Sequence, residues 1–279
     1  MAEHWKIEHP TTLDVGSEDE PIRSVEVKLV SGRVSVVASS TDDGTARLEA
    51  NEVRGGALDV TVSNGKLVVS HPKDTAEGWL NKLRAPWHNM SAMVSITAPA
   101  GAEVALATVS AETLVSGTQA RVRVKTVSGE VALDSVAGDV AAKTVSGAVE
   151  LREHAGGLEV NSVSGDVTVH ARALPRLAAK SVSGDLTVDL ADADAEAAVQ
   201  SQQAAKTVSG SVTVRLPAGA GYRVSAKSVS GDVVAGGERI GKGAGQSKGT
   251  LRSGDEGVQL DVSTLSGDIT LLHGADAQL

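Results

Sequence analysis

Apolar and polar residues alternate with a period of two along most of the chain. In residues 125–133, valine, alanine and leucine alternate with polar or small residues on both sides of a glycine. This period is typical of a β-strand with one buried face. The same frame recurs at 143–151, 161–169, 180–188 and 206–214, so we predict a series of equivalent strands.

A Val-Ser-Gly tripeptide lies at the centre of each of these frames. Intact copies occupy 30–32, 115–117, 127–129, 145–147, 163–165, 182–184, 208–210 and 229–231, and near-copies occupy 109–111, 136–138 and 265–267. The central copies are spaced by 18, 18 and 19 residues. A fixed period near 20 residues is typical of repeat architectures. We therefore predict an all-β fold, a parallel β-solenoid (β-helix-like) with a less regular N-terminal β region.

The alternation also predicts which residues face the core. Counted from the glycine, it places the motif valines inside: Val127, Val145, Val163, Val182 and Val208. The glycines are predicted structural corners, where a side chain would clash or φ must be positive. These corners are Gly129, Gly147, Gly165, Gly184, Gly210, Gly231 and Gly267.

Charged residues flank the motif on both sides. Lysine precedes it at Lys125, Lys143, Lys180, Lys206 and Lys227, and an acid follows the glycine at Glu130, Asp166, Asp185, Asp232 and Asp268. Stacked rungs, about 4.8 Å apart, place like charges beside each other. We expect the neighbouring column of opposite sign to offset part of that repulsion.

The regularity of the pattern changes along the chain. Residues 1–107 form a predicted irregular β region and residues 108–279 the regular repeats. In the first region, 25–37, 46–49, 58–62 and 66–70 are predicted strands, and residues 63–65 are a hairpin or corner signal. Residues 189–205 are rich in Ala and Gln, which favours helix, but their place between two rungs favours a loop followed by a strand, which we prefer.

Composition narrows the function classes. Hydrophobic residues make up 41% of the 279, yet there is no Phe, one Tyr and three Trp, so aliphatic side chains must fill a narrow core. A formal net charge of −9 argues against a nucleic-acid partner, because such proteins usually carry a basic face. With no Cys, disulfides, thiolate zinc sites and cysteine nucleophiles are excluded.

One segment departs from the repeat. Residues 74–93 form a predicted capping or inserted segment with two of the three tryptophans and a short helix near 75–85. It could cover an open end of the solenoid, dock on a partner or a second copy, or insert into a membrane interface. The candidate interaction residues are Trp79, Leu80, Lys82, Leu83, Arg84, Trp87 and Met90.

Other patterns have ordinary structural explanations. Residues 236–243 match the glycine spacing of a phosphate-binding loop, but Gly243 stands where a magnesium-binding hydroxyl is needed, so we predict a hairpin loop. The acidic run Asp189, Asp192, Asp194 and Glu196 lacks the spacing of a calcium loop. The Asp and Thr-Val-Ser columns fit corner chemistry. The seven histidines show no metal or triad spacing, so we predict no catalytic residue, cofactor or metal.

These motifs together resemble a known family. The repeated Thr/Ser-Val-Ser-Gly-Asp-Val-Thr-Val strands, the early Trp5–Ile7 segment and the Pro-Ala-Gly spacers at 99–101 and 217–219 resemble the bacterial β-strand-repeat "putative adhesin" family, domain of unknown function 4097. In particular, the chain looks like the members without a secretion signal that are common in actinobacteria. The resemblance covers nearly the whole chain. It implies a β-helix-like fold, no established enzymatic activity and a link to cell-envelope stress systems.

We therefore predict a non-enzymatic scaffold or protein-interaction module with a protein partner or self-association, and no small-molecule substrate. The alternative is a peripheral membrane or envelope-stress component acting through residues 78–93. A carbohydrate-active β-helix enzyme is the third hypothesis. The first six residues lack a secretory leader, and no run approaches the roughly 20 apolar residues of a membrane span. We expect a cytoplasmic protein, with membrane association as the alternative.

Overall fold

The computed structural model describes residues 2–41, 43–71, 90–191, 193, 202–217, 222–240, 242–243, 246–253 and 258–273. These residues form strands and turns, with no helix among them. The chain divides into two compact units, unit 1 (Met1–Val131) and unit 2 (Ala132–Leu279), and β12 (Val131–Asp134) contains the boundary. The predicted boundary between an irregular region (1–107) and regular repeats (108–279) stays a prediction.

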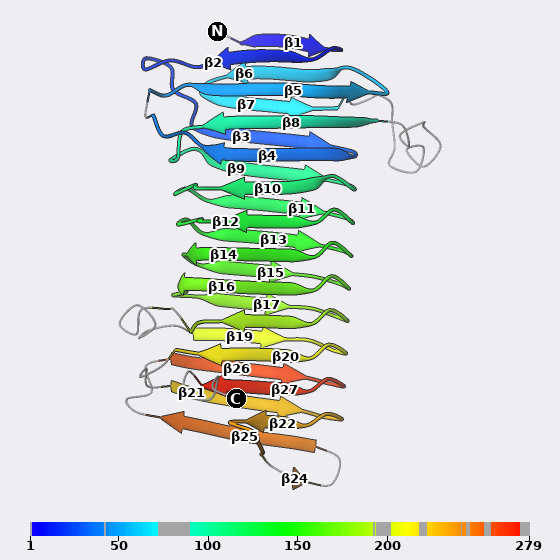
Figure 1. The fold of residues 1–279 in the computed structure, drawn as a ribbon, viewed down its shortest axis with the longest axis vertical. Coiled ribbons are helices and arrows are strands. Elements are labelled where there is room, and N and C mark those ends of the chain that lie inside the picture. Colours follow the sequence, from blue (N-terminus) through cyan, green and yellow to red (C-terminus); the bar gives the residue numbers. More distant parts are fainter. Residues whose placement is uncertain are drawn as a thin grey trace. The chain divides into compact units, whose positions relative to one another are not determined.

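In unit 1 the strands form two sheets, with the orders β1-β6-β7-β3-β9-β11 and β2-β5-β8-β4-β10 (Figure 1). Strands β3, β7, β9 and β11 pair in parallel, and so do β4, β8 and β10. Antiparallel pairs join β1 to β6 and β2 to β5. The bounds are β1 (Glu3–Ile7), β2 (Thr11–Val15), β3 (Ser24–Leu29), β4 (Gly32–Ala38), β5 (Ala46–Arg54), β6 (Leu58–Ser63), β7 (Lys66–Ser70), β8 (Ser91–Ala98), β9 (Glu103–Thr108), β10 (Glu112–Ser116) and β11 (Val122–Thr126).

The strands predicted in this region are confirmed, with one refinement. The predicted strand 25–37 is two strands, β3 and β4, because the Val30–Gly32 motif forms a corner and Gly32 has a φ of 108°. The hairpin signal is also confirmed. Asn64 and Gly65 join antiparallel β6 and β7 with φ angles of 51° and 72°, as a type I′ turn requires.

Unit 2 also has two mostly parallel sheets, and successive strands from β13 to β22 alternate between them (Figure 1). Their orders are β13-β15-β17-β19-β26-β21-β25-β24 and β14-β16-β18-β20-β27-β22-β23. The bounds are β13 (Val140–Thr144), β14 (Val149–Ala155), β15 (Leu158–Asn161), β16 (Val167–Ala173), β17 (Leu177–Lys180), β18 (Leu186–Asp189), β19 (Gln202–Lys206), β20 (Val212–Leu216), β21 (Tyr222–Ser228), β22 (Val233–Ala235), β23 (Glu238–Arg239), β24 (Lys242–Gly243), β25 (Gln246–Ser253), β26 (Val258–Thr264) and β27 (Ile269–His273).

The last rung of unit 2 is out of sequence order. Strand β26 pairs in parallel with both β19 and β21, and β27 pairs in parallel with both β20 and β22. The C-terminal rung therefore lies between two earlier rungs. On its other side, β21 pairs antiparallel with β25, and β25 pairs antiparallel with β24, the last strand of this sheet.

The core of each unit is aliphatic, as the composition predicts. Its largest fully buried side chains are leucine and isoleucine, and valine and alanine fill most of the remaining inward positions. Small branched side chains suit the narrow space between two closely packed sheets.

The predicted orientation of the motif valines is wrong. Val127, Val145, Val163, Val182 and Val208 are 43–46% exposed and point outward. The physical reason is that the alternation of buried positions shifts by one residue at the corner. Before the corner the buried residues have even numbers (Val122 and Val124), and after it they have odd numbers (Val131 and Leu133). The corner takes two consecutive outward residues, Val127 and Ser128, so the buried positions beside them are Thr126 and Gly129.

Two further sequence predictions can be compared with residues that the structure describes. Strand β19 agrees with a loop followed by a strand at 189–205, although residues 192 and 194–201 lie outside the described part. Gly236 and Gly237, with φ of 56° and 78°, join β22 to β23 in an antiparallel pair. The start of the phosphate-loop match is therefore a hairpin, as predicted.

Candidate functional site: an exposed aliphatic edge

Each Val-Ser-Gly corner of unit 2 is built on a buried hydroxyl. The Thr or Ser before the motif residue points inward. At the Val163 corner the Ser162 hydroxyl donates a hydrogen bond to the carbonyl of Gly165 at 2.6 Å, and at the other five corners the hydroxyl oxygen accepts a hydrogen bond from the glycine N–H three residues later. The donor–acceptor distances are 2.9 Å for Gly147–Thr144, 2.9 Å for Gly184–Ser181, 3.1 Å for Gly210–Thr207, 2.8 Å for Gly231–Ser228 and 3.0 Å for Gly267–Thr264. The bond bends the chain from one sheet to the other and leaves the valine and serine on the outside.

The glycine is needed because successive rungs approach closely. A Cβ on Gly165 would lie less than 3.0 Å from the carbonyl oxygen of Gly147, and one on Gly184 would lie equally close to the carbonyl oxygen of Gly165. The φ angles of these corner glycines lie outside the left-handed region. Of the two reasons predicted for the glycines, the clash is the one that the structure shows.

The corners place the motif residues in one column along one edge, at the right in Figure 1. The backbone N–H of each corner serine donates to the carbonyl of the motif residue one rung away: Ser164 to Val145, Ser183 to Val163, Ser209 to Val182, Ser266 to Val208 and Ser230 to Leu265. The column therefore runs in the order Val145, Val163, Val182, Val208, Leu265 and Val229, over about 24 Å. We name these residues and their serines the Val-Ser-Gly edge.

This edge holds the exposed aliphatic surface of unit 2. Val145, Val163, Val182 and Val208 are 43–46% exposed, Leu265 is 49% exposed and Val229 is half-buried. No other large hydrophobic residue among the described positions of unit 2 is exposed. Unit 1 repeats the feature at Val109 and Val127.

One serine of the edge, and one of the equivalent corners in unit 1, use their hydroxyls within the corner. The Ser164 hydroxyl donates to the carbonyl of Val145 at 3.2 Å, and Ser128 of unit 1 makes the same bond to Val109. These bonds agree with the structural explanation of the Thr-Val-Ser column. The edge therefore offers a partner a column of aliphatic side chains beside a column of exposed serines.

Two charged strips border the column. Exposed Lys143, Lys180, Lys206 and Lys227 lie where the chain enters the corner, and Asp166, Asp185, Asp268 and Asp232 lie where it leaves. The aspartates also support the backbone of the next rung: Asp166 accepts the N–H of Asp185 at 2.9 Å, and Asp185 accepts the N–H of Ser211 at 2.7 Å. This confirms the corner chemistry predicted for the Asp column. The edge thus has a positive side and a negative side.

Sequence reasoning missed the outward column, although a signal was present. A Thr or Ser before each motif valine of unit 2, together with the opposite parity of the apolar residues on its two sides, indicates a corner rather than the middle of a strand. The predicted interaction residues Trp79, Leu80, Lys82, Leu83, Arg84 and Trp87, and the predicted helix, lie outside the described residues. Met90 is half-buried, and its carbonyl accepts a hydrogen bond from the Ser31 hydroxyl at 2.7 Å.

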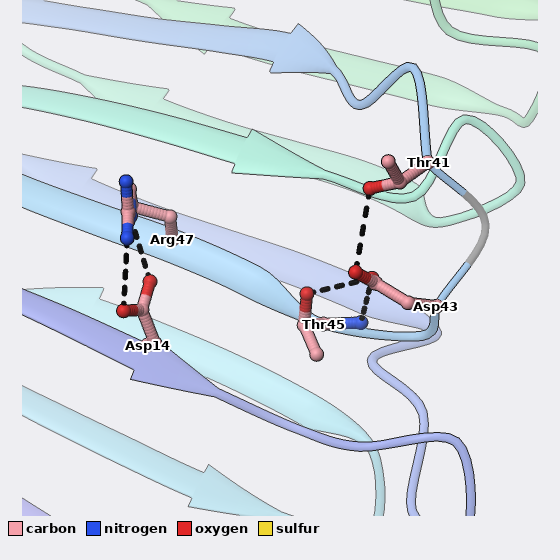
Figure 2. A network of polar contacts seen from close by, with 5 residues as sticks. All are labelled: Asp14, Thr41, Asp43, Thr45 and Arg47. Carbon is pink, nitrogen blue, oxygen red and sulfur yellow. Dashed lines mark hydrogen bonds and ion pairs between the residues drawn. The ribbon is translucent and has the colours of Figure 1, made fainter.

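The polar contacts of unit 1 in Figure 2 serve the fold. Arg47 donates two hydrogen bonds to the carboxylate of Asp14, at 2.7 and 3.0 Å, across the β2–β5 pair. These bonds lower the pKa of Asp14. Asp43 accepts hydrogen bonds from the hydroxyl and the backbone N–H of Thr45, which lower the pKa of Asp43. Both groups are held as ionised structural acceptors.

A surface hollow of about 290 Å³ in unit 1 is lined by Asp19, Glu20, Pro21, Arg23, Asn64 and Gly65. Asp19, Glu20 and Arg23 are solvent-exposed, so the hollow lacks the enclosed carboxylates of a glycosidase-type site. Among the described residues, no three His, Asp or Glu side chains are grouped to hold a metal ion. The same residues include no helix long and apolar enough to cross a bilayer.

The fold and the edge define a β-repeat protein with two mostly parallel sheets and one repeated corner. Residues 8–205 and 195–272 match the model of the Toastrack DUF4097 family, so the chain belongs to this family. Among curated proteins, none matches the chain.

Solved structures of three bacterial proteins match most of the chain, at low sequence identity and with low TM-scores. A "putative lipid binding protein" from Parabacteroides distasonis has 14% identity and a TM-score of 0.48, with 95% of this chain and 97% of that chain covered. A "putative adhesin" from Bacteroides fragilis has 12% identity and a TM-score of 0.36, with 95% and 98% covered. A "putative cell adhesion protein" from Clostridium sporogenes has 13% identity and a TM-score of 0.25, with 95% and 99% covered.

Proposed function

We propose that the protein is a non-enzymatic β-solenoid interaction module and that the Val-Ser-Gly edge is its binding surface. The observation that carries the proposal is the column of aliphatic side chains, each 43–49% exposed from Val145 to Leu265. Single exposed valines are ordinary on protein surfaces. A contiguous apolar column bordered by charged strips is typical of an interaction site.

The construction of the edge supports this role. Each corner is fixed by its Thr or Ser hydrogen bond and by close contact with the next rung. A surface that is already rigid loses little conformational entropy when a partner binds. The repeated rungs also give a partner several equivalent contacts, as in other solenoid binding surfaces.

The class of partner that fits is a protein. The membrane or envelope-stress alternative depends on residues 78–93 and stays a prediction, as does the cytoplasmic location. The actinobacterial origin stays a prediction too. The carbohydrate-active enzyme has no support from an enclosed carboxylate pair among the described residues.

Site-specific photo-crosslinking in the native cell tests the proposal. The photoreactive amino acid p-benzoylphenylalanine is placed at Val163 or Val182 on the edge, and at Glu159, which is exposed on the outer face of β15, as the matched control. We expect crosslinked protein adducts from the two edge positions and not from Glu159. Equal adducts from all three, or none from the edge in a folded protein, would contradict the proposed binding surface.

A further inference from the structure

We infer that the partner of the Val-Ser-Gly edge is a second copy of this chain, with the two aliphatic columns side by side and running in the same direction. The inference rests on the proposed function, because it names the partner of the same surface. It follows from the arrangement of charge on either side of the column.

The edge has its charges sorted by sign. On the side where the chain enters the corner, the residues of the six rungs are Lys143, Asn161, Lys180, Lys206, Ser263 and Lys227. On the side where the chain leaves it, they are Ala148, Asp166, Asp185, Ser211, Asp268 and Asp232. One strip is therefore only positive or neutral, and the other is only negative or neutral.

Symmetry decides how two such edges can meet. A two-fold axis parallel to the column exchanges the left and right sides of the facing copy, so the lysine strip of each copy lies against the aspartate strip of the other. A two-fold axis perpendicular to the column, parallel to the interface, keeps the sides and reverses the direction, so lysine faces lysine and aspartate faces aspartate. Opposite potentials favour association and like charges oppose it. The parallel pair is the complementary one.

The same axis keeps the rungs in register. Lys180 of one copy then faces Asp185 of the second copy, at the rung of Val182, and the reverse contact forms at the same level. The rung of Val229 offers the pair Lys227 and Asp232, although Arg239 already pairs with Asp232 at 3.0 Å within the chain. Between these charged contacts, the column of six aliphatic side chains of each copy is covered by the column of the other copy.

The charge pattern also disfavours other partners. An anionic membrane would attract the lysine strip but repel the aspartate strip that lies beside it. A second copy satisfies both strips at once. Because the aliphatic column is only one residue wide, the interface is small, and we expect a dissociation constant on the order of micromolar that rises with salt.

Cysteine crosslinking tests the parallel arrangement directly, because the chain has no natural Cys. Single cysteines replace Val145, Val182 and Leu265, which are three separate levels of the column, and Glu159→Cys on the outer face of β15 is the control. A short bismaleimide is added to the purified full chain. In a parallel pair each edge position lies opposite the same position of the second copy, so all three edge variants crosslink to dimers. In an antiparallel pair only the rung on the symmetry axis does so.

A charge exchange provides a second measurement. Lys180→Asp and Asp185→Lys should each weaken dimerisation about tenfold in sedimentation equilibrium at low salt, and the double variant should recover most of the loss. Asp185 also accepts the N–H of Ser211, so thermal unfolding is measured to confirm that each variant is folded. A double variant as weak as the singles would overturn the facing of Lys180 and Asp185.

The outcomes separate the two proposals. Crosslinks at all three edge levels and none at Glu159→Cys support the parallel dimer, and crosslinks at one level alone overturn it. If no edge cysteine crosslinks but photo-crosslinking captures a different protein, the proposed function holds and self-association fails. If neither method gives an edge adduct, both proposals fail.

Discussion

The N–H of Gly184 donates a hydrogen bond to the hydroxyl of Ser181 across 2.9 Å, beneath the exposed Val182 and Ser183. The same bond recurs at other corners of unit 2, for example from Gly210 to Thr207 at 3.1 Å. The tripeptide that dominates the sequence is thus the outer part of a four-residue corner, and the residue before it fixes the corner from inside.

Removing this inner hydroxyl should destabilise the protein. Thr207→Val keeps the shape of the side chain but leaves the buried N–H of Gly210 without its acceptor, so we expect a loss of about 1–3 kcal/mol in the free energy of unfolding. The same substitution at the half-buried Thr187 of β18 is the control and should change stability by less than about 0.5 kcal/mol. Chemical denaturation measures both, and equal losses would refute the role of the hydroxyl.

Glycine substitutions should separate steric clash from backbone strain. Gly165→Ala puts a methyl group against the carbonyl of Gly147, so we expect a loss of more than about 3 kcal/mol or no stable fold. Gly237 has open space but a φ of 78°, so Gly237→Ala should cost about 1 kcal/mol. Gly101→Ala has open space without a positive φ and should be nearly neutral. A Gly165→Ala protein as stable as the Gly101→Ala protein would show that the rungs can separate at low cost.

Much of the fold is predictable from the sequence because strands carry a strong local signal. The alternation of apolar residues and the repeat period are enough to predict an all-β fold, the strands between residues 25 and 70 and the Asn64–Gly65 hairpin. Non-local pairing is harder to predict. The placement of β26 between β19 and β21 brings together residues far apart in the chain, and nothing in the local pattern of 258–264 indicates it.

The candidate site was missed for a different physical reason. A period of two identifies the buried face only while the strand continues, and a corner changes the phase. Val163 has the same parity as Val167 and Val169, which are buried, but the corner at Val163 and Ser164 separates it from their strand. The motif valines that the alternation placed in the core therefore form the exposed column.

A matched pair of substitutions tests this register. Val163→Asp places the carboxylate in solvent, so we expect a change in the free energy of unfolding within about 0.5 kcal/mol. Val160→Asp, three residues earlier in β15, buries the same group in the core without a partner and should cost several kcal/mol. Thermal unfolding of the two variants gives the comparison. Similar melting temperatures would contradict the outward orientation of Val163.

Two buried histidines should make stability depend on pH. The Nδ1 of His154 lies 2.9 Å from the carbonyl oxygen of Val136, and its Nε2 is buried without a hydrogen-bond partner. In unit 1, the Nδ1 of His71 accepts the N–H of Val30 at 3.0 Å. Burial lowers the pKa of both imidazoles. Nothing in the local pattern around either histidine indicates this burial, because burial of a lone histidine depends on packing.

The sign of the pH effect follows from these lowered pKa values. Well above the unfolded pKa of about 6.5, both histidines are neutral whether the chain is folded or unfolded, so they add nothing to the pH dependence of stability. Below it, the unfolded chain binds protons first, and each histidine reduces stability by up to about 1.4 kcal/mol per pH unit until its lower folded pKa is reached. We expect the melting temperature to fall between pH 7 and pH 5, and His154→Gln to reduce this fall. The same substitution at the exposed His170 is the control. If His154→Gln and His170→Gln melt with the same pH dependence as the natural chain, burial of His154 does not govern acid stability.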